Sequence, residues 1–225
     1  MILSHIIAAL SAVVRSIQFE RDLGISSRDR LRYIKKSLRL GLCYAGFAVP
    51  WNPTEAWKAG EAAFLSCAYD VVTDWHGFDE KGRSVFESIL IHLSEPQLQE
   101  LALTLYDKDS QKQLCENGLE RGAIALRFIL KTMGCEEQRE STWGDLTELG
   151  ELLQIVDDVF DLEDDAAAGE QNCLITANRE MYLLRLIDHL NHQKCQRLFG
   201  RAPSVLIIAI QHARKKAQKL ISGAR

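Results

Sequence analysis

An acidic stripe runs through an otherwise apolar stretch of the chain, LLQIVDDVFDLEDD at 152–165. On an α-helix, at about 100° per residue, Asp157, Asp158 and Asp161 fall with Gln154 on one arc roughly 100° wide. The rest of the circumference is mostly aliphatic or aromatic, which inverts the pattern of an ordinary surface helix. We therefore expect the stripe to face an internal cavity. A capping or solvent-facing acidic surface is the alternative.

Carboxylates crowded in a cavity repel one another and are costly to remove from water unless a cation lies among them. Oxygen-only ligands favour a hard divalent ion, Mg²⁺, with Mn²⁺ as a substitute. A second acidic pair, Asp70 and Asp74, lies in AAFLSCAYDVVTDW at 62–75, and its four-residue spacing puts both acids on one helix face. We expect the two acidic helices to face each other across a metal-sized gap.

A cation is available on a third predicted helix, CENGLERGAIALRFILKTMG at 115–134. Arg121 is flanked by Gly118 and Gly122, whose lack of side chains makes room beside it. In that space the guanidinium could bind a phosphate through two hydrogen bonds. A salt bridge with Glu116 or Glu120 is an equally good interpretation.

The elements that must position these residues are helices throughout, because apolar residues recur at helical spacing and strand signals are almost absent. Asn52, Pro53 and Glu55 form a helix start, and Gly134 is a helix end. The sequence predicts one all-α bundle, a single domain over residues 1–225. The expected helices lie near 2–20, 27–48, 53–76, 83–93, 95–106, 109–134, 142–164, 177–193 and 203–222.

Two polar loops are expected between these helices, at 75–83 and 164–172. The second contains three alanines and a glycine among acidic residues, so it has few side chains that could anchor it. We expect the segment 164–174 to be mobile in the empty protein and to close over the site when a metal–diphosphate complex binds. An ordinary surface loop is the alternative.

Composition bounds the class of protein. The chain has 225 residues, 47% of them apolar, and a net charge of −4, which argues against a general nucleic-acid binder. Its six cysteines form no zinc or disulfide pattern, so we expect reduced thiols and a cytoplasmic protein. The apolar N-terminus is too short to span a bilayer, so no transmembrane segment is expected; it is either a packed first helix or a helix in peripheral contact with a membrane.

The two acidic motifs resemble those of the class I isoprenoid synthases, which include prenyl diphosphate, squalene, phytoene and terpene synthases. QIVDDVFD at 154–161 is similar to the second DDxxD motif of prenyl diphosphate synthases, and it also fits the terpene synthase pattern with Asp157, Asp161 and Asp165 as ligands. YDVVTDW at 69–75 resembles the first motif of squalene-type enzymes, and GLERG at 118–122 lies where the family often places a diphosphate-binding basic residue. The resemblance covers roughly residues 60–192.

The sequence also departs from the family. Tyr69 precedes Asp70, so the first motif lacks a doubled aspartate, and no Gly-Gly-Lys-Arg segment for isopentenyl diphosphate precedes it. The Arg-Tyr pair near the terpene synthase C-terminus is missing as well. The absence of an elongation site favours a terpene synthase. A prenyltransferase that joins isoprenoid units, or a catalytically silent subunit of an active synthase, are the alternatives.

The resemblance implies a helical bundle of the class I terpenoid synthase type with a central cavity. In such a site Mg²⁺ ions, held by the two acidic helices with Asp158 as a further metal-site residue, bridge to the diphosphate of an allylic substrate, and Arg121 binds the diphosphate. Aromatic rings stabilise the carbocation. A homodimer remains open. The implied substrate-binding residues, for whose aromatic members core packing is the alternative role, are Phe64, Tyr69, Phe128, Gln154 and Phe160.

Overall fold

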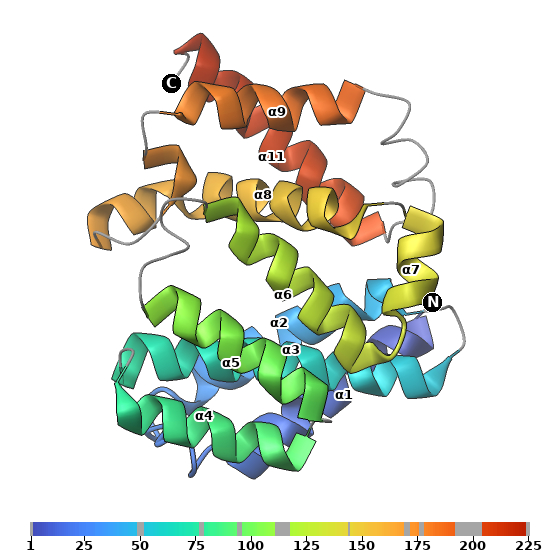
Figure 1. The fold of residues 1–225 in the computed structure, drawn as a ribbon, viewed down its shortest axis with the longest axis vertical. Helices are drawn as coiled ribbons and strands as arrows, with labels where there is room; N and C mark the ends of the chain where they lie inside the picture. Colours follow the sequence, from blue (N-terminus) through green and yellow to red (C-terminus); the bar gives the residue numbers. More distant parts are fainter. Residues whose placement is uncertain are drawn as a thin grey trace. The chain divides into compact units, whose positions relative to one another are not determined.

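The computed structural model shows an all-α protein (Figure 1). Most of the described residues lie in helices and none lies in a strand, which confirms the all-α prediction. The described residues are 2–48, 52–76, 79–93, 96–110, 118–143, 145–168, 172–175, 178–191 and 204–223.

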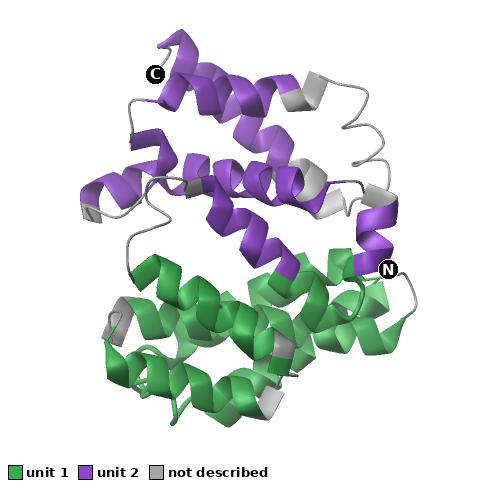
Figure 2. Ribbon diagram, in the orientation of Figure 1, with its two compact units in different colours: residues 1–110, 128–136 green, residues 111–127, 137–225 purple. Residues whose placement is uncertain are grey.

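The chain divides into two compact units (Figure 2). Unit 1 contains residues 1–110 and 128–136, and unit 2 contains residues 111–127 and 137–225. The boundary runs through one helix, α6 (Gly118–Met133), which contributes to both units. The prediction of a single domain stays a prediction, because a division into compact units leaves open whether each would fold alone.

Unit 1 is organised around three helices that pack on one another: α1, α2 and α3. Gly60 of α3 lies against α1 so closely that an added Cβ would stand 2.2 Å from the Ala8 carbonyl oxygen and 2.5 Å from the Ser11 Cβ. Small residues thus allow the close approach of these helices. The elements of the unit, besides its part of α6, are α1 (Ile2–Phe19), α2 (Arg30–Tyr44), η1 (Ala45–Phe47), α3 (Pro53–His76), α4 (Glu80–Leu93) and α5 (Pro96–Ser110).

Both helix boundaries that the sequence assigns to particular residues are confirmed. The Asn52 Oδ1 accepts the Glu55 N–H at 3.2 Å, and the Asn52 amide donates to the Glu55 carboxylate at 2.9 Å, which is a reciprocal cap for α3. Gly134 ends α6 with a φ of 70°. Its N–H donates to the Lys131 carbonyl, and the Cys135 N–H donates to the Leu130 carbonyl, as in a Schellman motif.

Unit 2 packs its helices around α8 (Leu146–Ala168). Its core joins Leu119 of α6 and the apolar face of α8 to residues of η3, α9 and α11. The other elements of the unit are α7 (Glu136–Trp143), η3 (Cys173–Ile175), α9 (Arg179–Asn191) and α11 (Ser204–Ser222).

Both predicted loops are wrong in part. Of the loop predicted at 75–83, residues 75–76 belong to α3 and residues 80–83 belong to α4. Residues 164–168 continue α8 instead of leaving it, and the described chain resumes at Asn172 before η3. Alanine has the highest helix propensity of all residues, so Ala166, Ala167 and Ala168 extend the helix that precedes them. The first half of the predicted mobile segment is therefore regular structure.

Candidate acidic site

α8 is held in place by its start and by its apolar face. The Asp145 Oδ1 accepts the N–H groups of Thr147 at 2.8 Å and Glu148 at 3.3 Å, which caps the helix. Six apolar side chains of the helix are then buried, namely Leu146, Leu149, Leu152, Ile155, Val156 and Val159. This burial fixes the rotation of α8 and decides which of its acids reach solvent.

Two of the predicted ligands lie together on the outer face of α8. Asp157 and Asp161 are both exposed, one helical turn apart, and Phe160 beside them is 39% exposed. The stripe was expected to line a cavity on a helix buried around the rest of its circumference. Instead, α8 has an ordinary division into a buried apolar face and an exposed acidic face.

Asp158 does not share that face, contrary to the expectation for the stripe. Asp158 is only 5% exposed, and both of its carboxylate oxygens accept hydrogen bonds within the protein. Gln154 donates to Oδ1 at 2.9 Å, and the Cys173 N–H donates to Oδ2 at 2.9 Å. The doubled aspartate of the motif is thus divided, with Asp157 directed outward and Asp158 directed inward.

Asn172 completes this inward network, and the sequence analysis missed it. Its side-chain amide donates to the Asp158 carbonyl at 2.7 Å and to the Asp165 carboxylate at 2.8 Å. Its Oδ1 accepts the Leu174 N–H at 2.9 Å. Asn172 therefore ties η3 to the end of α8. An Asn directly before a short apolar segment, here Cys173 to Ile175, is a capping signal that could have identified it.

The same network surrounds a cysteine. Burial, followed by the negative charge of Asp158, raises the pKa of the Cys173 thiol well above its ordinary value. The thiol therefore stays protonated at neutral pH, and a protonated, buried thiol is a poor nucleophile. Cys173 consequently acts as a packing residue of η3.

The first acidic motif lies in unit 1. Asp70 of α3 is partly exposed and forms an ion pair with Lys36 of α2, with 2.7 Å between Nζ and Oδ2. The side chain of Asp74 lies outside the described residues, although its backbone is part of α3. The ion pair gives Asp70 a cationic partner within its own unit.

The glycine beside Arg121 makes room for a helix. A Cβ on Gly122 would stand 2.2 Å from the Gly150 carbonyl oxygen and 2.7 Å from the Gln154 Cβ, so α6 and α8 cross here in close contact. The expectation that Gly122 opens space for a ligand is therefore wrong. Arg121 itself is partly buried.

Three of the predicted substrate-binding aromatics lie in the interior of unit 1. Phe64 is fully buried and stacks on Phe19, with 5.5 Å between ring centroids. The Tyr69 hydroxyl donates to the Asp109 carboxylate at 2.5 Å, and Phe128 is also buried. These positions favour the packing alternative. Phe160, in contrast, lies beside the exposed acids of α8, near the ring of His212.

The carboxylates do not by themselves form a metal centre. Within the described part of the chain, no group of three or more His, Cys, Asp or Glu side chains is arranged to hold a metal ion. Mg²⁺, however, is usually bound by one or two carboxylates, with phosphate oxygens and water as its other ligands. Asp157 and Asp161 fit that smaller requirement.

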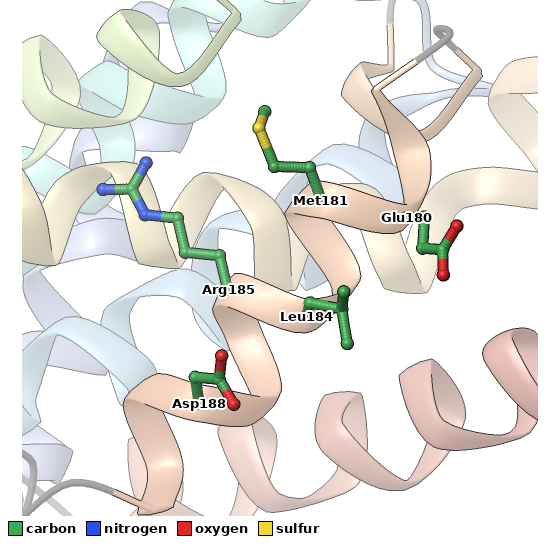
Figure 3. A pocket seen from close by; sticks show the side chains of 5 residues that line it. All are labelled: Glu180, Met181, Leu184, Arg185 and Asp188. Carbon is green, nitrogen blue, oxygen red and sulfur yellow. The ribbon is translucent and has the colours of Figure 1, made fainter.

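An open hollow lies on α9, and none of the residues that the sequence singled out lines it (Figure 3). The side chains that line it all project from this one helix, and its Arg185 forms an ion pair with Glu151 of α8 at 2.5 Å. Specific small-molecule sites bring polar groups together in a concave pocket. The hollow therefore lacks the features of a specific small-molecule site, and the acids of α8 remain the candidate site. Its lining residues are Glu180, Met181, Leu184, Arg185 and Asp188.

Comparisons of the chain with protein-family models, curated proteins and solved structures found no match. The resemblance to class I isoprenoid synthases therefore rests on the motifs alone. The geometry of α8 is the structural observation on which a function must be argued.

Proposed function

We propose that the protein is a Mg²⁺-dependent class I terpene synthase, which ionises an allylic isoprenoid diphosphate and cyclises or quenches the carbocation. The observation that carries the proposal is the exposed pair Asp157 and Asp161 on α8. The two acids have the spacing of metal ligands in the motif that the sequence resembles.

In this proposal Asp157 and Asp161 hold Mg²⁺, with Asp165 near the end of the same helix. The ion supplies charge neutralisation to the departing diphosphate. Asp165 already accepts a hydrogen bond from Asn172, which leaves its second oxygen to consider as a ligand. Asp158 acts as a positioning residue, because its bond to the Cys173 N–H ties the helix on which the ligands lie to η3.

Phe160 is the aromatic that best fits a substrate-binding role in this proposal. It is the member of the predicted set that is exposed beside the acids. An aromatic face stabilises a nearby cation by about 0.5–2 kcal/mol. Arg121 remains a predicted diphosphate-binding residue, and Asp70 remains a predicted metal ligand whose role a variant described below tests.

The test is incubation of pure protein with Mg²⁺ and C10, C15 or C20 allylic diphosphates, each with and without isopentenyl diphosphate. Terpene products without isopentenyl diphosphate support the proposal. Longer prenyl diphosphates that form only in its presence identify a chain-elongating prenyltransferase, and a head-to-head product identifies a squalene-type enzyme. Absence of any product, while diphosphate and Mg²⁺ still bind, contradicts the catalytic proposal.

A silent partner subunit is the second candidate, and a specific observation favours it. Asp158 is committed to structural hydrogen bonds, Asp70 is paired with Lys36, and Asp165 accepts a hydrogen bond from Asn172, so these predicted metal-site acids have protein partners. A silent subunit would raise the activity of an added prenyl synthase while showing none alone. Mixing the protein with an active synthase and measuring product formation distinguishes the two candidates.

A further inference from the structure

α1 is an apolar helix that turns its large side chains outward. Six of them are between 47% and 79% exposed and recur every three or four residues along one face: Ile2, Leu3, Ile6, Leu10, Val14 and Ile17. The buried face instead carries small residues along most of its length, namely Ser4, Ala8, Ala9, Ser11, Ala12 and Ser16, with Phe19 buried at the end of the helix. A helix of an isolated globular protein normally has the opposite arrangement.

The direction of this exposed face follows from the contacts of α1 with α3. Ser11 donates to the Trp57 carbonyl at 2.8 Å, and Arg15 forms an ion pair with Glu61, so these two residues mark the side of α1 that faces α3. At about 100° per residue, the exposed aliphatic face is centred on the other side of the helix. Ala8 and Ala12 meet Gly41 of α2 between these two directions, so one edge of the exposed face borders α2.

α2 continues the apolar surface. Its contact with α1 runs through Gly41, whose added Cβ would stand 3.0 Å from the Ala8 carbonyl oxygen and 3.1 Å from the Ala12 Cβ. Lys36 marks the side of α2 that faces α3, because it pairs with Asp70. Three exposed leucines lie on the side away from Lys36, next to α1: Leu31, Leu38 and Leu42.

A basic rim borders these leucines. The 15 residues of α2 include five basic side chains and no acidic one, although the whole chain has a net charge of −4. Lys35 and Arg39 are exposed and follow the leucines around the helix, and Arg32 is exposed beyond them. Aliphatic side chains next to a basic edge are typical of helices that lie in a membrane interface.

We propose that α1 and α2 form a docking surface for an anionic membrane, with the aliphatic side chains in the acyl boundary and the basic rim on lipid headgroups. The patch holds only Leu, Ile and Val at its exposed positions, whereas protein–protein interfaces are enriched in aromatic residues, Met and Arg at their centres. An isologous dimer through the patch would leave its basic rim without acidic partners. An anionic lipid surface satisfies both features.

α1 lies on the membrane in this proposal and does not cross it. Among the described helices, α1 is long and apolar enough to span a bilayer by length and composition, yet 39% of it is buried inside the protein. The expectation from the sequence that this segment is too short to span a bilayer is therefore wrong, and the burial of its other face is what opposes crossing. Crossing would also remove Ser11 from its bond to α3 and separate the close contacts at Gly41 and Gly60.

Flotation of the full chain with vesicles tests the proposal. We expect binding to phosphatidylcholine vesicles that contain phosphatidylserine, weak binding to phosphatidylcholine alone, and release at high salt. Leu10→Asn should weaken binding about threefold to tenfold. Lys35→Gln with Arg39→Gln should weaken it by roughly fivefold per charge, on anionic vesicles only.

Matched controls come from elsewhere in the chain. Ile91→Asn changes an aliphatic residue of α4 that is 66% exposed, and Lys215→Gln with Lys219→Gln removes two exposed charges of α11. Both controls should bind like the unchanged protein, and all variants should keep the same helical circular dichroism. Equal losses in patch and control variants, or no binding by the unchanged protein, overturn the proposal.

Two further results would also overturn it. Binding that resists high salt and alkaline extraction would mean that α1 spans the bilayer. A dimer in sedimentation velocity that Leu10→Asn dissociates, without any vesicle binding, would mean that the patch joins two copies of the chain.

Discussion

α1 and α8 are both long helices rich in apolar residues, yet they bury opposite kinds of side chain. α8 buries its large aliphatic residues and exposes Asp157 and Asp161, whereas α1 buries alanine and serine along most of its length, with Phe19 at its end, and exposes leucine and isoleucine. Burial of α8 stabilises through apolar area, at about 25 cal/mol per Å². Burial of α1 depends on the close helix approach that small residues permit. We propose a binding role for the exposed face of each helix, toward a cation on α8 and toward lipid on α1.

The largest expected effect concerns the exposed acids of α8. Asp157→Asn and Asp161→Asn should each lower turnover of an allylic diphosphate by on the order of a hundredfold or more, because each removes a proposed metal ligand. The thermal midpoint of the metal-free protein should hold or rise, since a charge is removed from an acidic face. Turnover and thermal unfolding are measured on the same preparations.

Glu163→Gln is the matched control for these variants, because Glu163 is an exposed acid on another face of α8. It should keep nearly full turnover. A similar loss for Glu163→Gln would show that overall negative charge matters and that specific ligands do not. Full turnover of all three variants would remove α8 from the active site.

A second difference should appear within the doubled aspartate. Asp158→Ala should lower the free energy of unfolding by about 2–4 kcal/mol, because it leaves the Cys173 N–H and the Gln154 amide without their acceptor. Asp161→Ala should change it by no more than about 0.5 kcal/mol, as is usual for exposed positions. Urea unfolding of the two variants measures the difference. Equal stabilities would contradict the structural role of Asp158.

The packing of the buried face of α1 can be tested by adding a methyl group to the glycines of α3 and α2 that contact it. Gly60→Ala should cost about 1–3 kcal/mol of unfolding free energy, because the new Cβ would stand 2.2 Å from the Ala8 carbonyl oxygen. Gly41→Ala meets its neighbours at 3.0–3.1 Å, and the higher helix propensity of alanine offsets most of its cost. Its stability should therefore change by less than about 1 kcal/mol. A Gly60→Ala protein as stable as the unchanged one would contradict the close packing of α1 on α3.

The smallest expected effect concerns Asp70 of α3 and its ion pair with Lys36. Lys36→Gln should lower the free energy of unfolding by less than about 1 kcal/mol, because its ion pair with Asp70 is largely exposed. If Asp70 binds metal in the working enzyme, Lys36→Gln should leave turnover unchanged or raise it, while Asp70→Asn should lower it strongly. Parallel small losses for both variants would identify the pair as structural only.

The helices could be predicted because their signals are local. The predicted limits 53–76 coincide with α3, and Asn52 and Gly134 act as the cap and the stop that their residue types indicate. The local sequence does not determine which way a side chain on a helix faces in the folded protein. Asp158 turns inward because of Cys173, which follows it by fifteen residues, and no spacing rule within α8 contains that contact.

The sequence of α1 also does not show which of its faces is buried. Its apolar residues predict a packed helix, and α1 is packed, but through the face that carries mainly small residues. The decisive residues are Gly41 and Gly60 on the neighbouring helices, which accept a close backbone but no large side chain. Likewise, the sequence around Gly122 predicts space for a ligand. It does not show that α8 fills this space at Gly150, because Gly150 is distant in sequence.

The bonds of Asn172 link the end of α8 to η3 in a way that governs how this region opens. The amide hydrogens of Cys173 and Leu174 are donated to Asp158 and Asn172, and Asn172 in turn is bonded to α8. Neither amide can exchange with deuterium unless its acceptor moves, and the acceptors are joined. The two amides should therefore exchange with a common free energy of opening, as parts of one cooperative unit. Asp158→Ala should accelerate both together, while amides in the middle of α8 keep their protection.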